Sequence, residues 1–269
     1  MSARVVVDVD GGVADVRLAR PEKMNAFDRQ MFDDLVAAGE SLKADRSVRA
    51  VVLSGEGRAF SAGLDLSIFG EMASGERGGS SIISREGRSG PANRGQQAVW
   101  VWRELEVPVI AAVHGHALGA GFQLALGADL RIVAPDAALS VLEVRWGLIP
   151  DMCGTWLLPR LIGPQAAAEL FWTGRMVPGT EAVAMGLALR CADDPHAEAL
   201  ALARDIAARS PQSIAEGKRL LGLSTAPGRT VDEQLRDEER TMAALIGSPN
   251  QKEAVEAWFA KRPPAFTDR

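Results

Sequence analysis

Apolar and polar positions alternate in two short segments near the N-terminus, as they do in strands with one buried face. Residues 4–9 and 13–19 show this alternation, and an Asp-Gly-Gly turn lies between them. We therefore predict a β-hairpin. Farther along, apolar residues recur at helical spacing over 29–44, directly after Asp28, a candidate N-cap. This range is predicted to be a helix.

Continuous apolar runs follow, and they predict buried strands over 48–53, 109–113 and 130–134. A helical segment at 122–127 separates the last two runs. Strands that alternate with helices indicate an α/β fold with parallel pairing. Residues 73–95 are instead rich in Gly, Ser and Arg, which predicts a mobile surface loop.

The pattern becomes helical throughout after about residue 195, with Pro residues marking the boundaries. Helices are predicted over 195–209, 211–222, 230–245 and 249–260. We therefore divide the chain into an α/β core, residues 1–195, and a helical C-terminal region, residues 196–269.

Composition excludes several classes of protein. The chain has 269 residues, a formal net charge of -5 and only 5% aromatic residues, with no Tyr. Neither a nucleic-acid binding field nor a stacking platform is expected from these values. The two cysteines do not form a Cys-x-x-Cys pair, and no run of 18 apolar residues predicts a membrane span. Since the N-terminus reads as a strand and not as a signal peptide, we expect a cytoplasmic protein.

A glycine-rich turn at 119–121 lies between a predicted strand and a predicted helix. Glycine lets the backbone approach a ligand closely, and a helix N-terminus presents unpaired N–H groups with partial positive charge. A ligand oxygen that becomes negative would be stabilised there. The turn can equally serve packing alone. It lacks the third glycine of a dinucleotide fingerprint, because Leu124 occupies that position.

A second small, glycine-bearing stretch, residues 57–66, follows the 48–53 strand and can supply another backbone donor. It can also be an ordinary surface connection. Ser61 resembles the serine of a nucleophile elbow, but Ala59 stands where that elbow requires Gly, so we do not expect a nucleophile.

Glu143 and Asp151 lie eight residues apart and flank an apolar segment. A carboxyl among apolar neighbours has a raised pKa, which suits proton transfer near neutral pH. The alternative is a surface Glu and a helix-capping Asp. His114 and His116 have no ligand cluster nearby, so no metal site is expected.

Taken together and in this order, these stretches resemble the crotonase superfamily of enoyl-CoA hydratases and isomerases. The resemblance covers most of the chain. Its segments are 20–26 (Arg-Pro-Glu-Lys-Met-Asn-Ala), 59–66, 111–121, 128–129, 147–150, 173–174 and 257–262.

The resemblance implies a crotonase-like α/β core of stacked ββα units forming a spiral, and C-terminal helices that assemble a homotrimer or a dimer of trimers. It implies an acyl-CoA thioester substrate, with coenzyme A as part of the substrate and no separate cofactor. It also implies an oxyanion hole made by the backbone amides of Leu64 and Ala120. The positions that the resemblance assigns to coenzyme A binding are Lys23, Met24, Ala62, Asp65, Leu66 and, from a neighbouring subunit, Trp258 and Lys261.

The reaction depends on which carboxyls are present. Hydratases of the family use two glutamates to activate water, and these fall on Glu143 and on position 123, which here is Gln123. Glutamine cannot act as a general base near pH 7. Dienoyl-CoA isomerases instead pair an acid at the Glu143 position with an Asp that falls on Asp151. They also have an acid at position 123, so this match is incomplete.

We therefore expect Glu143 and Asp151 to shift a double bond by proton transfer, with Gln123 polarising or positioning. The alternatives are an enoyl-CoA hydratase, in which Glu143 and Gln123 manage the water, and a non-catalytic acyl-CoA binder. RNA binding, which a few relatives show, is disfavoured by the acidic balance and the sparse aromatics.

Overall fold

A six-stranded mixed sheet forms the centre of the computed structural model, which describes residues 3–73, 83 and 90–269. Its strands, in spatial order, are β1 (Val5–Asp10), β2 (Val13–Leu18), β3 (Ala50–Gly55), β4 (Val109–Val113), β6 (Leu130–Val133) and β9 (Arg190–Cys191). The first two form the predicted antiparallel hairpin, and the remaining neighbours are parallel. The predicted α/β class is confirmed.

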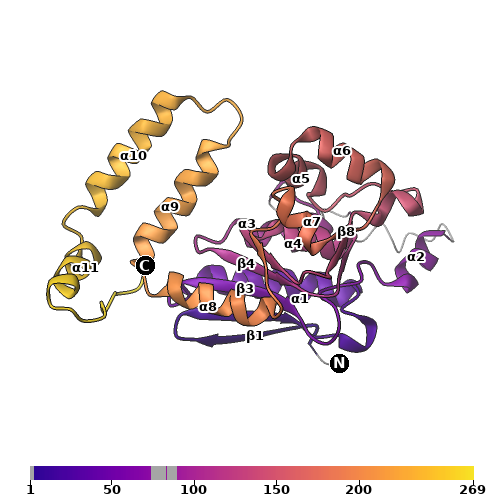
Figure 1. Ribbon diagram of the computed structural model, residues 1–269, viewed down its shortest axis with the longest axis horizontal. Helices are drawn as coiled ribbons and strands as arrows, with labels where there is room; N and C mark the ends of the chain where they lie inside the picture. Colours follow the sequence, from indigo (N-terminus) through magenta and orange to yellow (C-terminus); the bar gives the residue numbers. More distant parts are fainter. Residues whose placement is uncertain (1–2, 74–82, 84–89) are drawn as a thin grey trace.

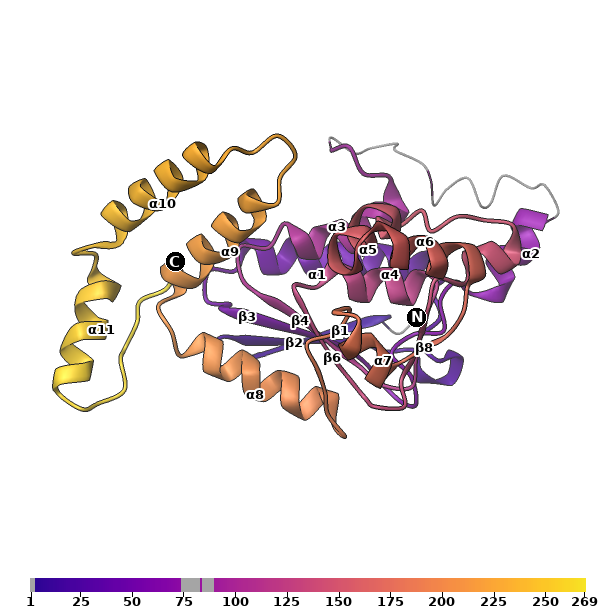
Figure 2. The same ribbon diagram turned by 45° about the horizontal axis from the view of Figure 1, so that its top comes forward.

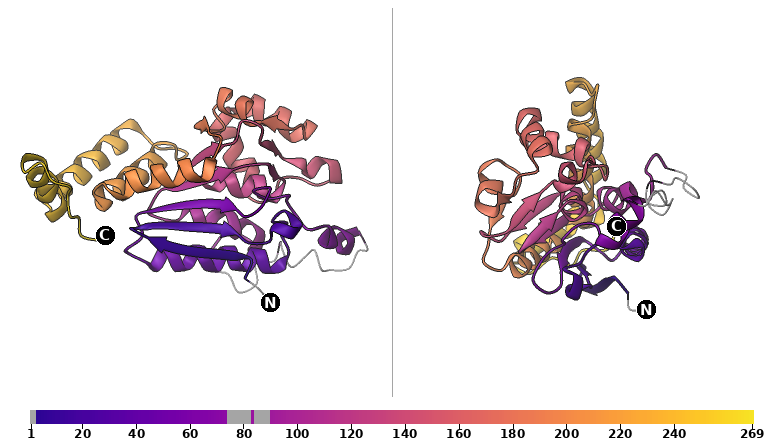
Figure 3. Two further views of the ribbon diagram at one scale, coloured as in Figure 1. Left: turned by 60° about the horizontal axis from the view of Figure 1, so that its bottom comes forward. Right: turned by 90° about the vertical axis from the view of Figure 1, so that its right-hand side faces the viewer.

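Alternate residues of these strands supply two separate cores. Val51 and Leu53 pack with the helices α1 (Arg29–Ala44), α3 (Arg94–Arg103) and α4 (Ala120–Gly127). Ala50 and Val52 pack on the other face against α8 (Pro195–Ala207). The sheet therefore lies between two helical layers (Figure 3). Its central strands β3 and β4 are buried on both faces, as their continuous apolar runs predicted, whereas β1 at the edge is largely exposed.

The helix predicted over 29–44 is confirmed, and Asp28 caps it by accepting a hydrogen bond from Met31 N at 2.9 Å. The strand predicted over 48–53 lies two residues later, because the pairing of Val13 with Ala50 sets where the ladder begins. Helix α3 was not predicted. It begins with a capping box between Asn93 and Gln96, inside the range predicted as a loop; the rest of that range lies mostly outside the described residues.

A smaller three-stranded sheet and several short helices cover one edge of the core. These elements are β5 (His116–Leu118), β7 (Ala138–Ser140), β8 (Val177–Pro178), the helices α2 (Leu66–Ala73), α5 (Gly154–Ile162), α6 (Pro164–Thr173) and α7 (Gly179–Ala184), and the 3₁₀ helices η1 (Pro21–Lys23) and η3 (Leu142–Trp146). Their strands have only two or three residues, too few for a periodic pattern in the sequence.

The last three helices project from the core as an arm (Figure 1). They are α9 (Pro211–Ser224), α10 (Val231–Leu245) and α11 (Pro249–Phe259), and with α8 they confirm the four predicted C-terminal helices. Since α8 packs on the sheet, the part that leaves the core begins after it and not at residue 195 (Figure 2). Among the helices of the described residues, none combines the length and the hydropathy that a membrane span requires.

Candidate active site

Three backbone segments run side by side and in the same direction where the two sheets meet. Ser61 and Ala117 form a parallel bridge, and β5 pairs in parallel with β7, with Leu118 opposite Ser140. Each segment leads directly into a predicted site residue: the first into Leu64, the second into Ala120, and the third into Glu143. Parallel pairing therefore gathers residues that lie far apart in the sequence.

Glycines permit the close approach of the first two segments. A Cβ atom on Gly121 would lie 2.5 Å from the Ser61 Cβ, and one on Gly63 would lie 2.6 Å from the Leu118 carbonyl oxygen. Gly63 also has a φ of +90°, a backbone conformation that residues with a side chain rarely adopt. The same Cβ position is 3.7 Å from Ala120 N, so Leu64, the next residue, lies beside the start of α4.

The Leu64 and Ala120 amides are both available as donors, since neither has an acceptor among the residues described. Ala120 is the first residue of α4, where the N–H groups lack intrahelical partners and carry the positive end of the helix dipole. Two such donors on adjacent segments can stabilise an oxygen that gains negative charge. Their convergence on one thioester oxygen stays a prediction.

Glu143 lies at the start of η3, next to the beginning of α4. A Cβ atom on Gly119 would lie 3.4 Å from the Glu143 Oε1. That oxygen accepts a hydrogen bond of 2.6 Å from Gln123 Nε2. The second oxygen, Oε2, is buried and has no partner within the described part of the chain. One carboxylate oxygen is thus held and the other is free to exchange a proton.

Gln123 is completely buried, and its hydrogen bonds determine which way its amide points. The Oε1 atom accepts from Met152 N at 2.8 Å and from Gly154 N at 3.0 Å. Because its oxygen is occupied, the amide nitrogen must face Glu143. Of the two roles predicted for Gln123, polarising and positioning, these contacts favour positioning.

Asp151 precedes the segment that Gln123 holds, and its side chain is accessible to solvent. Burial raises the pKa of Glu143, the nearby Asp151 charge raises it further, and the bond from Gln123 opposes the increase. Although Asp151 is exposed, desolvation by the protein atoms around its carboxyl raises the pKa of that group. Burial and the Asp151 charge together raise the pKa of the Cys153 thiol to about 11, so the neutral thiol predominates near pH 7.

The residues predicted to bind coenzyme A from this subunit lie in the 59–66 segment or in the 20–26 segment beside it. Ala62 N donates to the Met24 carbonyl oxygen at 2.8 Å, which places Lys23 and Met24 beside it. Asn25 connects the two segments, since its buried amide donates to the carbonyl oxygens of Glu56 and Ala59. Lys23 is exposed, as an ammonium group that meets a phosphate must be.

The Asp65 side chain is already engaged. It accepts from Arg20 at 2.5 Å and from the Ser67 amide at 3.0 Å, at the start of α2. Burial acts to raise the pKa of Asp65, but the bonds from Ser67 and Arg20 lower it to about 2. The carboxylate therefore holds α2 against the 20–26 segment. The backbone of Asp65 is engaged as well, because its N–H donates to the Phe27 carbonyl oxygen at 2.9 Å and its carbonyl oxygen accepts from Ile68 N at 3.0 Å. A contact of Asp65 with coenzyme A stays a prediction.

Trp258 and Lys261 lie at or just beyond the end of α11, whereas α2 is at the opposite end of the molecule (Figure 1). They cannot reach the site of the same subunit. The Trp258 side chain is 81% exposed, and other apolar side chains along the arm are also open. A contact with coenzyme A from a neighbouring subunit stays a prediction, as does the oligomeric state.

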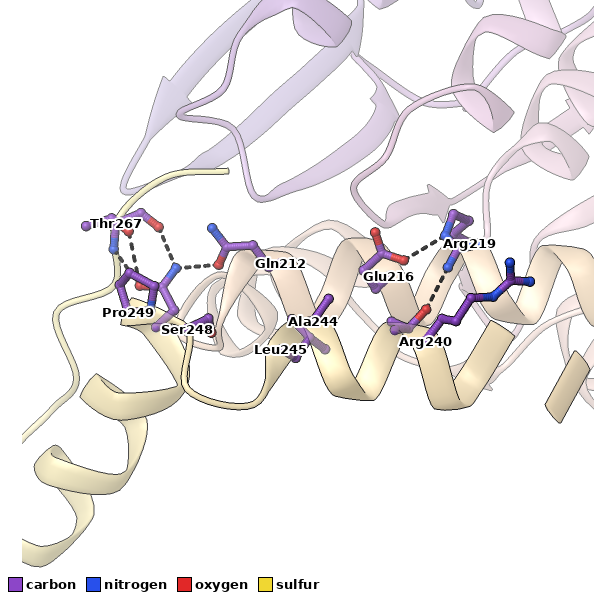
Figure 4. Close-up of a pocket in the computed structure, with 11 residues that line it drawn as sticks. Gln212, Glu216, Arg219, Arg240, Ala244, Leu245, Ser248, Pro249 and Thr267 are labelled. Carbon is purple, nitrogen blue, oxygen red and sulfur yellow. Dashed lines mark hydrogen bonds and ion pairs between the residues drawn. The ribbon is translucent and has the colours of Figure 1, made fainter. Parts of the chain in front are cut away.

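A crevice of about 490 Å³ lies between α9, α10 and the C-terminal residues (Figure 4). Several of its polar groups bond to one another: Arg219 pairs with Glu216 and donates to Thr241, and Asn250 donates to the Thr267 carbonyl oxygen. These polar side chains therefore already have hydrogen-bond partners within the crevice. None of the residues that line it belongs to the predicted site.

Two aromatic residues lie beside the site: the sequence pointed to the pocket near Trp146, whereas Phe69 was not predicted to belong to it. Phe69 of α2 and Trp146 of η3 have ring centroids 4.8 Å apart with an interplanar angle of 31°. Phe69 lies outside the segments that pointed to the site, and only tertiary packing brings it to Trp146. Ser61, by contrast, has a buried hydroxyl that donates to the Asn25 carbonyl oxygen and accepts from Gly63 N, a structural use.

Known proteins resemble this chain in sequence and in fold. The sequence profile described as Enoyl-CoA hydratase/isomerase matches residues 8–269. A protein of Bacillus subtilis (strain 168) named probable enoyl-CoA hydratase is 34% identical over 261 residues, covering 96% of each chain. The 1,2-epoxyphenylacetyl-CoA isomerase of Escherichia coli (strain K12) is 34% identical over 277 residues, covering 98% of each. A crystal structure of a probable enoyl-CoA hydratase/isomerase from Mycobacterium abscessus superposes with a TM-score of 0.86 at 34% identity, covering 98% of this chain and 99% of that one.

Proposed function

The chain belongs to the enoyl-CoA hydratase/isomerase family, and from that premise we propose that it moves a carbon–carbon double bond along the acyl chain of a coenzyme A thioester. The observation that carries the proposal is the environment of Glu143. Its partner is the Gln123 amide, whose oxygen already accepts two backbone N–H groups. A second carboxylate to activate water is missing at that position, which supports proton transfer to and from carbon over the addition of water.

In the proposed reaction, the thioester oxygen accepts hydrogen bonds from the amides of Leu64 and Ala120. Glu143 Oε2 removes a proton from C2 of a 3-enoyl thioester, and the electron pair of that C–H bond passes into a dienolate. The oxyanion donors stabilise this charge, for which one donor contributes about 3–4 kcal/mol. Glu143, or Asp151, then returns a proton to C4, and the double bond ends between C2 and C3.

The pKa of Glu143 supports this role. Burial raises it, and a base with a raised pKa takes a proton from carbon more readily and returns it when the dienolate collapses. Gln123 serves as a positioning residue, because its bond to Oε1 leaves Oε2 as the oxygen that meets the substrate. The relative named 1,2-epoxyphenylacetyl-CoA isomerase supports isomerase chemistry on this fold.

Hydration of a 2-enoyl thioester is the second candidate. It is favoured by the relatives that are named enoyl-CoA hydratase. Water would then be held by Glu143 and by the second N–H of the Gln123 amide. This arrangement has one general base where the hydratases described above use two carboxyls, so we expect hydration to be the slower reaction.

The test is to incubate the purified protein with 2-enoyl-, 3-enoyl- and 3,5-dienoyl-CoA and to identify the products. We expect the 3-enoyl or dienoyl substrate to be isomerised faster than water is added. Glu143→Gln should lower kcat about 10²–10⁴-fold, because it removes the general base while keeping an acceptor for Gln123. Asp151→Asn, at the accessible carboxyl, is the matched comparison.

Full activity of the Glu143→Gln variant on the best substrate would show that another group carries the proton. Binding of coenzyme A esters with no turnover of any unsaturated chain would favour the non-catalytic binder instead. Faster hydration than isomerisation would assign the second candidate function.

A further inference from the structure

The aromatic pair beside the catalytic carboxyl has a geometry of its own. Trp146 follows Glu143 by three residues in η3. Side chains three apart eclipse in a 3₁₀ helix, so the indole stands on the same side as the carboxyl group. Phe69 comes from α2, which begins two residues after the donor Leu64. The two rings therefore connect the element that follows the oxyanion donor with the element that carries the base.

The Phe69 and Trp146 rings are in contact, and Trp146 remains partly exposed to solvent. Their planes are tilted by 31°, and the Trp146 side chain remains 55% exposed. Leu66, at the start of α2, is 72% exposed, and Ile149, just after η3, is 69% exposed. An exposed aromatic surface, flanked by the exposed aliphatic side chains of Leu66 and Ile149, therefore lies beside Glu143.

We propose that Phe69 and Trp146 form an acyl-selecting wall that favours thioesters whose reacting carbons are conjugated to an aromatic ring. The proposal rests on the proposed function. The dienolate is planar, and an aryl group on C4 extends that plane. A flat group can stack on an indole face over its whole area, whereas a flexible alkyl chain must give up rotamer freedom to do the same.

The test compares two 3-enoyl thioesters with the same number of acyl carbons, 4-phenyl-3-butenoyl-CoA and 3-decenoyl-CoA. The wild-type protein should have the higher kcat/KM on the aryl substrate. Trp146→Leu and Phe69→Leu should lower kcat/KM for the aryl substrate about 10-fold and change the alkyl value little, since stacking is lost and apolar burial is kept. Trp146→Phe should retain part of the preference.

Trp156→Leu is the matched control, because that indole stacks on Arg160 and not on Phe69. It should leave the aryl-to-alkyl ratio unchanged. Calorimetry with the saturated esters 4-phenylbutanoyl-CoA and decanoyl-CoA measures the same selection without turnover, and Trp146→Leu should weaken only the aryl ester.

Equal kcat/KM on both substrates, or an equal loss on both in Trp146→Leu, would overturn the aromatic wall while the isomerase assignment stands. Isomerisation of neither substrate, together with no isomerisation of the 3,5-dienoyl thioester, would overturn the proposed function. In that case the calorimetric affinities alone would test the aromatic wall. Equal affinity for both saturated esters would reject it.

Discussion

At the scale of single residues, the decisive feature is the pairing of one carboxyl with one amide. The sequence showed that Gln occupies position 123, but not what the amide does. In the structure its oxygen holds the backbone of Met152 and Gly154, and its nitrogen holds Glu143. This arrangement leaves a single buried carboxylate oxygen without a partner among the described residues.

Gln123→Glu tests this reading. It would put a carboxyl oxygen where the amide nitrogen now lies, 2.6 Å from Glu143 Oε1, and two carboxyls so close share one proton. One carboxyl of the pair would then be protonated and the other ionised, which provides both the acid and the base that water addition needs. We therefore expect hydration of 2-enoyl-CoA to rise at least about 10-fold and isomerisation to fall, with the apparent pKa of the pair read from the pH dependence of kcat/KM.

Gln123→Leu is the control for this variant, because it removes the hydrogen bonds without adding an acid. It should lose isomerase activity and acquire no hydration. A Gln123→Glu protein that hydrates no faster than the wild type would argue that a missing second carboxyl is not what limits water addition.

At the scale of elements, the site depends on how closely α4 approaches the 59–66 segment. Gly121→Ala would place a Cβ 2.5 Å from the Ser61 Cβ, so one of the two segments must move. We expect a loss of about 1–3 kcal/mol in the free energy of unfolding, typical of overpacking. A drop in kcat should accompany it, since Ala120 and its amide shift with the helix.

Gly217→Ala is a matched control on α9, where a new Cβ meets no atom within 4 Å and φ is not positive. It should stabilise the helix by about 0.5–1 kcal/mol and leave kcat unchanged. Denaturant unfolding measures both free energies. A Gly121→Ala variant with normal stability and activity would mean that the donor does not depend on this contact.

At the scale of the whole molecule, contacts between distant parts of the chain hold the last core helix in place. His196, in α8, bonds to Asp15 of β2 with Nε2 and Oδ1 2.9 Å apart, across 181 residues of sequence. The bond to Asp15 raises the pKa of His196. Burial acts to raise the pKa of Asp15, but the bonds from His196 and Arg17 lower it.

The pH dependence of stability follows from these directions. The raised pKa of His196 means that its contribution is complete below the ordinary value of 6.5 and is lost as the pH rises through the folded-state value. The lowered pKa of Asp15 means that its contribution is present above 3.8 and is lost as the pH falls through the folded-state value. The pair should stabilise the fold most between these two ordinary values.

His196→Gln should therefore lower the free energy of unfolding most in that window, by the order of 0.2–1 kcal/mol expected for a partly exposed pair. The difference from the wild type should shrink as the pH rises toward alkaline values. Urea unfolding of both proteins across this range measures it. A difference that grows with rising pH would contradict the assigned direction.

Much of the fold followed from local patterns. The hairpin, the helix after Asp28 and the four C-terminal helices are where the sequence predicted them, because each has enough residues for its periodicity to be seen. The short strands β5 and β7 were missed for the opposite reason. Those two strands align α4 with η3, so the element that sets the site geometry is also the element with the weakest sequence signal.

The sequence by itself determined which elements form and which residue types stand at the site: the glycines that allow close approach, one glutamate, and an amide in place of a second acid. Only the tertiary structure decided how those groups act. Four features depend on segments remote in sequence. They are the direction of the Gln123 hydrogen bonds, the burial that raises the pKa of Glu143, the ion pair of Arg20 with Asp65, and the contact of Phe69 with Trp146. Such contacts arise only when parallel strands bring those segments together, and local preferences of the chain do not encode them.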